Sequence, residues 1–144
     1  MTDFRYQKGI DAYCKRVNKT IQPDCIILHG SIARGTAHGD SDVDIVVIGG
    51  NMPDNFFKRL YLLNRLREDQ TPIEAVGYSR EEWEKMMNNL HLTTLEALEW
   101  GVPLQGETLF RKWRRQLDEL KKQGLKRSER SWSAPPELQR SKVA

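Results

Sequence analysis

The stretch of residues 28–47 constrains this chain more than any other, because a glycine-rich loop joins two apolar segments and the second segment opens with carboxylates. Gly30 and Ser31 begin the loop, and loops of this kind present backbone N–H groups and a hydroxyl to phosphate. Asp42 and Asp44 open the second segment, and carboxylates are ligands that Mg²⁺ prefers beside substrate phosphates. Since side chains alternate along a strand, the two aspartates are predicted to share one face and the same metals. The combination indicates nucleotide chemistry.

This stretch resembles three other motifs, but it lacks a residue or an order of elements that each of them requires. A P-loop requires a lysine after its second glycine, and residues 30–50 contain no lysine. An EF-hand calcium loop that began at Asp40 would need glycine and glutamate where the chain has Ile45 and Asn51. A phosphatase-type Asp-x-Asp pair would follow its strand, whereas this pair opens one. The simplest alternative is a glycine-rich hairpin with solvated acids, but carboxylates that lead into an apolar strand repel each other without a cation.

The loop and the acids together resemble a known signature. Gly30-Ser31-Ile32-Ala33-Arg34-Gly35, followed by Asp40-Ser41-Asp42-Val43-Asp44, is similar to the signature of the DNA polymerase β nucleotidyltransferase superfamily. The best match is its minimal nucleotidyltransferase branch, and the resemblance extends over residues 20–110. It implies an α/β fold in which a small mixed sheet is flanked by helices. It also implies Mg²⁺-dependent transfer of a nucleoside monophosphate from an NTP at a site with three carboxylates.

The resemblance assigns roles to residues of this chain. It implies that two Mg²⁺ ions bind Asp42 and Asp44, and that Gly30 and Ser31 contact the β- and γ-phosphates. Arg34 would reach the triphosphate or the surface of a partner, and its alternative is a surface ion pair.

The family's third carboxylate, most often Asp, lies on the strand after the Asp-x-Asp strand. Glu74 is the only acid of the apolar stretch 73–78, so we expect it to be the third metal ligand or the base. The alternative is a glutamate on an edge strand that faces water. Because Glu is one methylene longer than Asp, a displaced Glu74 would impair turnover before it impaired nucleotide binding.

The resemblance also suggests a partner. Members of this branch are often paired with HEPN-domain proteins, and some adenylylate a partner toxin and act as its antitoxin. We therefore expect transfer of AMP from ATP to a hydroxyl on a HEPN-type protein. Two alternatives stay open: a small-molecule hydroxyl, as in antibiotic-modifying relatives, and a non-catalytic antitoxin that masks its partner by contact alone.

The charges of the chain are unevenly distributed. Residues 1–110 hold 12 Lys and Arg against 16 Asp and Glu, whereas residues 111–144 hold 11 against 4. A basic end can contact nucleic acid or an acidic partner, but a solvated face is the more common explanation, and nucleic acid is not favoured. From Leu125 onwards there is little to bury. We therefore predict a nucleotidyltransferase domain over residues 1–124 and a basic, mobile tail over 125–144.

The cellular location is predicted from the lack of membrane and export signals in the sequence. No apolar run approaches the length of a membrane span, and the first residues do not resemble a signal peptide. Cys14 and Cys25 fit no metal spacing and are typical of free thiols in a leaderless chain. A cytoplasmic protein without membrane contact is expected.

The hydrophobic periodicity predicts the remaining elements. Ser79-x-x-Glu82 and Thr93-x-x-Glu96 are predicted capping boxes, and Pro103 confines its strand to a sheet edge. Three tryptophans at helical positions are expected in the core: Trp83, Trp100 and Trp113. The predicted strands cover residues 25–28, 42–48, 73–78 and 102–104, and the predicted helices cover residues 3–20, 31–34, 54–68, 79–87, 93–100 and 109–120.

Overall fold

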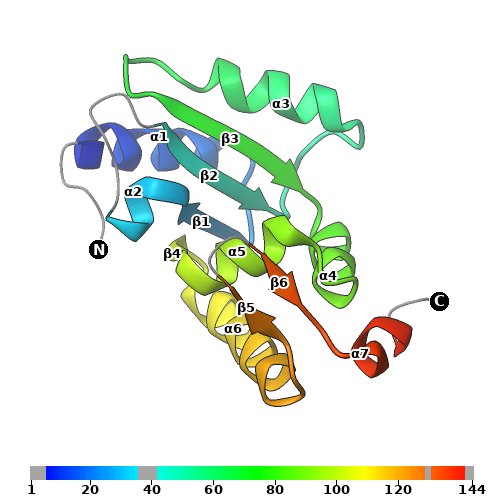
Figure 1. The fold of residues 1–144 in the computed structure, drawn as a ribbon. Coiled ribbons are helices and arrows are strands. Elements are labelled where there is room, and N and C mark those ends of the chain that lie inside the picture. The colour runs from blue at the N-terminus through cyan, green and yellow to red at the C-terminus, as the bar shows by residue number, and fades with distance from the viewer. Residues whose placement is uncertain (1–5, 36–41, 129–130, 142–144) are drawn as a thin grey trace.

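The fold is organised around one mixed sheet (Figure 1). The structure is a computed structural model that describes residues 6–35, 42–128 and 131–141. Its four-stranded sheet has the order β3-β2-β1-β4, in which β1 is antiparallel to β2 and β4, and β2 is parallel to β3. This confirms the predicted mixed sheet and places the proline-containing strand at an edge. The strands are β1 (Cys25–His29), β2 (Val43–Ile48), β3 (Ile73–Tyr78) and β4 (Val102–Gln105).

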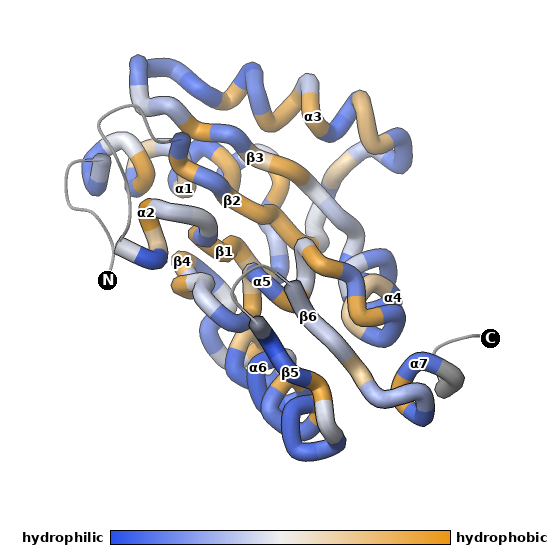
Figure 2. The backbone as a smooth tube through the Cα atoms, viewed as in Figure 1, coloured by the Kyte–Doolittle hydropathy of each residue, from blue (hydrophilic) through white to orange (hydrophobic). Residues whose placement is uncertain are grey.

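Both faces of the central strands are buried, so their sequences read as continuous apolar runs. On one face, Ile26 and Val47 pack with residues of α1 (Gln7–Thr20) and with Leu63 of α3 (Phe56–Arg65). On the other face, Ile27 and Val46 pack with residues of α4 (Arg80–Asn88), α5 (Leu92–Trp100) and α6 (Glu107–Lys122). Figure 2 shows the hydrophobic residues concentrated in the strands and hydrophilic stretches along α6.

Helix ends show which local signals decide the structure. The predicted capping box of α4 is confirmed: the Glu82 backbone N–H donates to Ser79 Oγ at 3.0 Å, and the Ser79 N–H donates to Glu82 Oε1 at 2.7 Å. The second predicted box is wrong, because α5 begins at Leu92 and its N-cap is His91. Glu96, the second residue of that predicted box, instead binds residues that are distant in the sequence.

The tryptophans divide between core and surface. Trp83 and Trp113 are fully buried with ring centroids 6.0 Å apart, which confirms the prediction for these two. The prediction is wrong for Trp100, which is 39% exposed at the end of α5. Its ring is covered in part by arginines rather than by apolar side chains.

The segment after residue 124 packs on the rest of the chain. β5 (Lys126–Arg127) pairs antiparallel with β6 (Trp132–Ser133), and α7 (Pro136–Ser141) follows. Leu125 and Leu138 are buried in the core cluster beside α6. The expectation that this segment has little to bury is therefore wrong, whereas the domain boundary at residue 124 stays a prediction. We call residues 126–133 the C-terminal hairpin, of which 129–130 lie outside the described residues.

None of the helices within the described ranges is long and apolar enough to span a membrane.

A candidate nucleotide and metal site

Three polar residues form a row across neighbouring strands at one end of the sheet. His29 of β1 pairs with Asp44 of β2, and Asp44 pairs with Glu74 of the parallel strand β3. Paired residues on adjacent strands lie on the same face, with strands about 4.8 Å apart. Asp44 therefore lies beside a carboxylate that is thirty residues away in the sequence, on the face that α5 and α6 cover.

The carboxylates crowd one another. Burial of Asp44, together with the negative charges of Glu74 and Asp42, raises the pKa of the Asp44 carboxyl to about 6. Asp42 comes directly before β2 and is exposed, and Glu74 is exposed on the edge strand. Glu74 therefore faces water from an edge strand, as the alternative expectation had it, and it also lies next to Asp44, as a third metal ligand or base would.

The phosphate loop lies against the same carboxylate. Gly30 is the first residue of α2 (Gly30–Arg34) and has a φ of +76°, a conformation that favours glycine. A Cβ atom at this position would lie 2.2 Å from Asp44 Oδ2, so only glycine allows the loop to approach the aspartate this closely. Ser31 follows in the first turn of α2, where backbone N–H groups have no partner within the helix.

Metal binding at this row depends on the chemistry of its donors. Within the described part of the chain, no group of three or more His, Cys, Asp or Glu side chains is arranged so that it could hold a metal ion. The carboxylates of Asp42, Asp44 and Glu74 nevertheless fit Mg²⁺, which prefers oxygen ligands. The negative charges of Asp42 and Glu74 help to raise the pKa of Asp44, and a bound cation would relieve this repulsion. Asp40 lies outside the described residues. The assignment of Asp42, Asp44 and Glu74 as metal ligands stays a prediction.

Arg34, at the end of α2, stacks on an aromatic ring. Its guanidinium carbon lies 4.5 Å from the ring centroid of Trp100, and that of Arg127 lies 5.5 Å from the same centroid. The predicted phosphate contact of Arg34 is not tested by this arrangement. The stacking shows that the end of α2 contacts the end of α5 at this site.

Sequence reasoning missed Glu96, which connects the site to the C-terminal hairpin. Arg127 donates to both carboxylate oxygens of Glu96 at 2.9 Å, and the Trp132 indole N–H donates to Oε2 at 3.1 Å. The Arg127 hydrogen bond is the largest cause that lowers the Glu96 pKa, and the charge of Arg34 adds to it.

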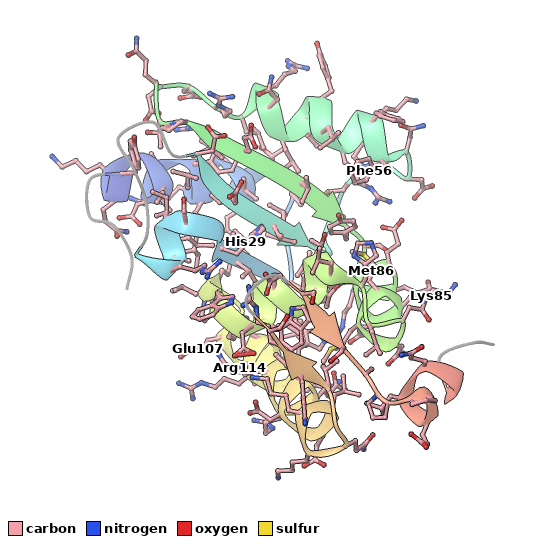
Figure 3. The ribbon with its side chains drawn as sticks, in the orientation of Figure 1. His29, Phe56, Lys85, Met86, Glu107 and Arg114 are labelled. Carbon is pink, nitrogen blue, oxygen red and sulfur yellow. The ribbon has the colours of Figure 1, made fainter. Side chains whose placement is uncertain are left out.

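His29 is the second residue that the sequence did not indicate as part of the site. Burial lowers the pKa of its imidazole, and the negative charge of Glu96 opposes that effect. Figure 3 shows His29 at the end of β1, on the side of the sheet where α5 lies. No local spacing could have indicated this group, because its members come from β1, α5 and the C-terminal hairpin.

The comparisons with known proteins agree with this geometry. The family model of the nucleotidyltransferase domain matches residues 10–88, more than half of the 144 residues, and the chain belongs to that family. This confirms the family resemblance seen in the sequence. No curated protein is similar enough in sequence to be matched to this chain.

Solved structures share the fold. A crystal structure of a toxin–antitoxin with AMP-PNP has a TM-score of 0.55 and 18% identity, covering 78% of this chain and 86% of that one. Two mutants of the toxin–antitoxin MntA-HpeT have TM-scores of 0.52 and 0.50 with identities of 16% and 18%. Each alignment covers 78% of this chain, and 85% and 86% of the respective structures. At these identities, the likeness confirms the mixed α/β fold.

Proposed function

We propose that this nucleotidyltransferase transfers AMP from ATP to a hydroxyl group of a partner protein, with Mg²⁺ as the cofactor. The observation that carries the proposal is the placement of Asp44 between Gly30 of the phosphate loop and Glu74 of the next strand. A phosphate-binding loop and two strand carboxylates in direct proximity are suited to transfer of a phosphoryl-linked group.

Each residue has a distinct task in this reaction. Gly30 and Ser31 bind the β- and γ-phosphates and orient the α-phosphorus, Asp42 and Asp44 would hold the metal ions, and Glu74 acts as the base. When bound, Mg²⁺ lowers the pKa of the attacking hydroxyl and neutralises charge on the entering and leaving oxygens. The hydroxyl oxygen bonds to the α-phosphorus, the bond from that phosphorus to the pyrophosphate oxygen breaks, and the hydroxyl proton passes to Glu74.

A protein acceptor is supported by two observations. Glu74 is exposed at the edge of the sheet, where a macromolecular hydroxyl can approach it. Three of the structures that share the fold are named toxin–antitoxin, and the name of one includes AMP-PNP. We propose further that the protein is a cytoplasmic, antitoxin-type enzyme that acts on a HEPN-type protein.

The test begins with the genes that neighbour this one: a HEPN-type protein encoded there is purified and incubated with this enzyme, Mg²⁺ and each α-labelled NTP, and transfer of the label is measured. We expect ATP to give the fastest labelling of that protein. Loss of the partner's toxicity without labelling would instead favour masking by contact, and labelling of a small molecule alone would exclude a protein acceptor.

Glu74→Gln tests the assignment of the base. We expect labelling to slow by about a hundredfold or more, as for removal of a general base, with ATP affinity nearly unchanged. The matched control is Glu81→Gln, an exposed glutamate of α4 away from the row. Equal losses of rate and of ATP affinity in Glu74→Gln would make Glu74 a binding ligand and not a base.

A further inference from the structure

A groove of about 510 Å³ runs along the outer edge of the sheet, between α3 and β3. Its α3 side is lined by Leu60, Tyr61 and Asn64, with Arg67 just beyond the end of that helix. Its strand side is lined by Glu74 and Val76. The proposed catalytic base is therefore also a wall of this groove, so an occupant of the groove lies next to the reacting groups. Figure 1 shows α3 running alongside β3 at this edge.

The strand side of the groove offers backbone hydrogen-bonding groups. Among the described residues, β3 pairs with β2 on one side and with no strand on the other. The contacts recorded beyond this ladder involve the ends of the strand, at Ile73, Gly77 and Tyr78. Because the Val43 N–H donates to Pro72 and the Gly49 N–H donates to Tyr78, the even-numbered residues of β3 direct their backbone groups to β2, and Ala75 keeps its N–H and C=O facing outward. An extended chain can pair with such an edge as an added strand.

The side chains of the groove select a protein segment rather than a polynucleotide. The charges of Arg67 and Glu74 cancel, and Arg67 donates a hydrogen bond to Asn64 at 3.1 Å. A nucleic acid would need several cations to neutralise its phosphates, and the surplus of Lys and Arg lies in residues 111–144 instead. Tyr61, which is 66% exposed, and Leu60 offer the aromatic and aliphatic surface that peptide side chains contact.

We propose that this groove binds an extended segment of the partner protein, which pairs with the edge of β3 and presents its acceptor hydroxyl to Glu74. The inference rests on the proposed function and adds where the acceptor binds. Because side chains alternate along a strand, the segment places its hydroxyl residue beside Glu74 and an apolar residue two positions away, beside Val76.

Two variants test the groove, with one matched control. Asn64→Trp fills the groove from an exposed position, and Tyr61→Ala removes part of its wall. The control is Phe57→Ala, which truncates a 76% exposed aromatic of the same helix that does not line the groove. The probe is the HEPN-type protein of the labelling test, titrated without nucleotide and then used as acceptor with α-labelled ATP.

We expect both groove variants to weaken binding of that protein by about tenfold or more, as for loss of a central interface contact. The KM for the acceptor should rise by a similar factor while kcat and ATP affinity change little, and Phe57→Ala should behave as the wild type. In the wild-type protein, amide hydrogen exchange at Ala75 should slow when the partner binds.

The outcomes separate this inference from the proposed function. Labelling with an unchanged Kd for Asn64→Trp, and no protection at Ala75, would overturn the groove and leave the transfer reaction standing. A complex that protects Ala75 without labelling would support the groove and overturn the transfer reaction. If wild type and that protein form no complex, the occupant proposed here is wrong.

Discussion

Replacing Asp44 with asparagine should stabilise the metal-free protein at neutral pH. In the folded state, burial and the charges of Glu74 and Asp42 raise the pKa of Asp44 from 3.8 to about 6. A raised pKa means that the folded state holds the proton more tightly than the unfolded state does. The stabilisation by that proton is complete below pH 3.8 and is lost as the pH rises through about 6. Asparagine has nearly the same shape and carries no charge, so it avoids this loss.

The size of the effect follows from the shift. A change of about two pKa units corresponds to at most about 3 kcal/mol, at about 1.36 kcal/mol per unit. The Asp44 side chain is only half-buried, and solvent screening reduces this to about 1–1.5 kcal/mol. For a chain of 144 residues, the unfolding entropy is about 0.3 kcal/mol per kelvin. Asp44→Asn should therefore melt about 3–5 °C above the wild type at pH 7.5.

Thermal unfolding from pH 3.5 to 7.5, with chelator present, measures this difference. The advantage of Asp44→Asn should shrink as the pH falls and vanish below pH 3.8. Adding Mg²⁺ and ATP at about a hundredfold excess over Kd should stabilise the wild type by about 2.7 kcal/mol and leave the variant unchanged. Asp118→Asn, which neutralises an exposed acid of α6, is the control and should show neither effect. A lower Tm for Asp44→Asn at pH 7.5, or a gain of equal size at every pH, would refute the reasoning.

Three further changes test the surroundings of the site. Gly30→Ala should destabilise the protein by about 1–3 kcal/mol, because its positive φ is strained for alanine and its Cβ would meet Asp44. An unchanged Tm would contradict this close packing. Arg127→Ala should lower the Tm, and Arg127→Lys should not restore it, because a lysine cannot bridge both oxygens of Glu96. Equal Tm values for wild type and Arg127→Ala would show that the hairpin contact is not stabilising. Ser79→Ala should cost about 1 kcal/mol by removing the helix cap, seen as a fall of about 3 °C in Tm, and an unchanged Tm would exclude a role for the cap.

Local signals predicted much of the fold. The apolar runs located the four strands of the sheet, and the capping box at Ser79 located the start of α4, because each depends on residues close in the sequence. The loop at Gly30 and the pair Asp42 and Asp44 were visible for the same reason. Glu74 was assigned by family resemblance, and its place beside Asp44 follows from a parallel register that no local pattern specifies.

Long-range partners explain what the sequence did not reveal. Glu96 has the spacing of a capping-box residue, but Arg127 and Trp132 offer it three hydrogen bonds, and the helix starts elsewhere. Trp100 follows the helical period of the core, yet it lies at the end of α5, where its ring contacts Arg34. Leu138 is a lone apolar residue in a polar segment, and only the tertiary structure shows that it is buried.

The link between Glu96 and Arg127 also has a consequence for synthesis on the ribosome. The phosphate loop at Gly30 is translated long before Arg127, and at about 5–20 residues per second the interval of nearly one hundred residues lasts roughly 5–20 s. From its own synthesis until Arg127 and Trp132 follow, Glu96 lacks the arginine and the indole that hold it in the finished protein. The carboxylate row can form as soon as β3 has emerged, whereas the surroundings of His29 and Arg34 are completed only when the hairpin docks. A nascent chain therefore acquires its nucleotide loop early and its finished site late.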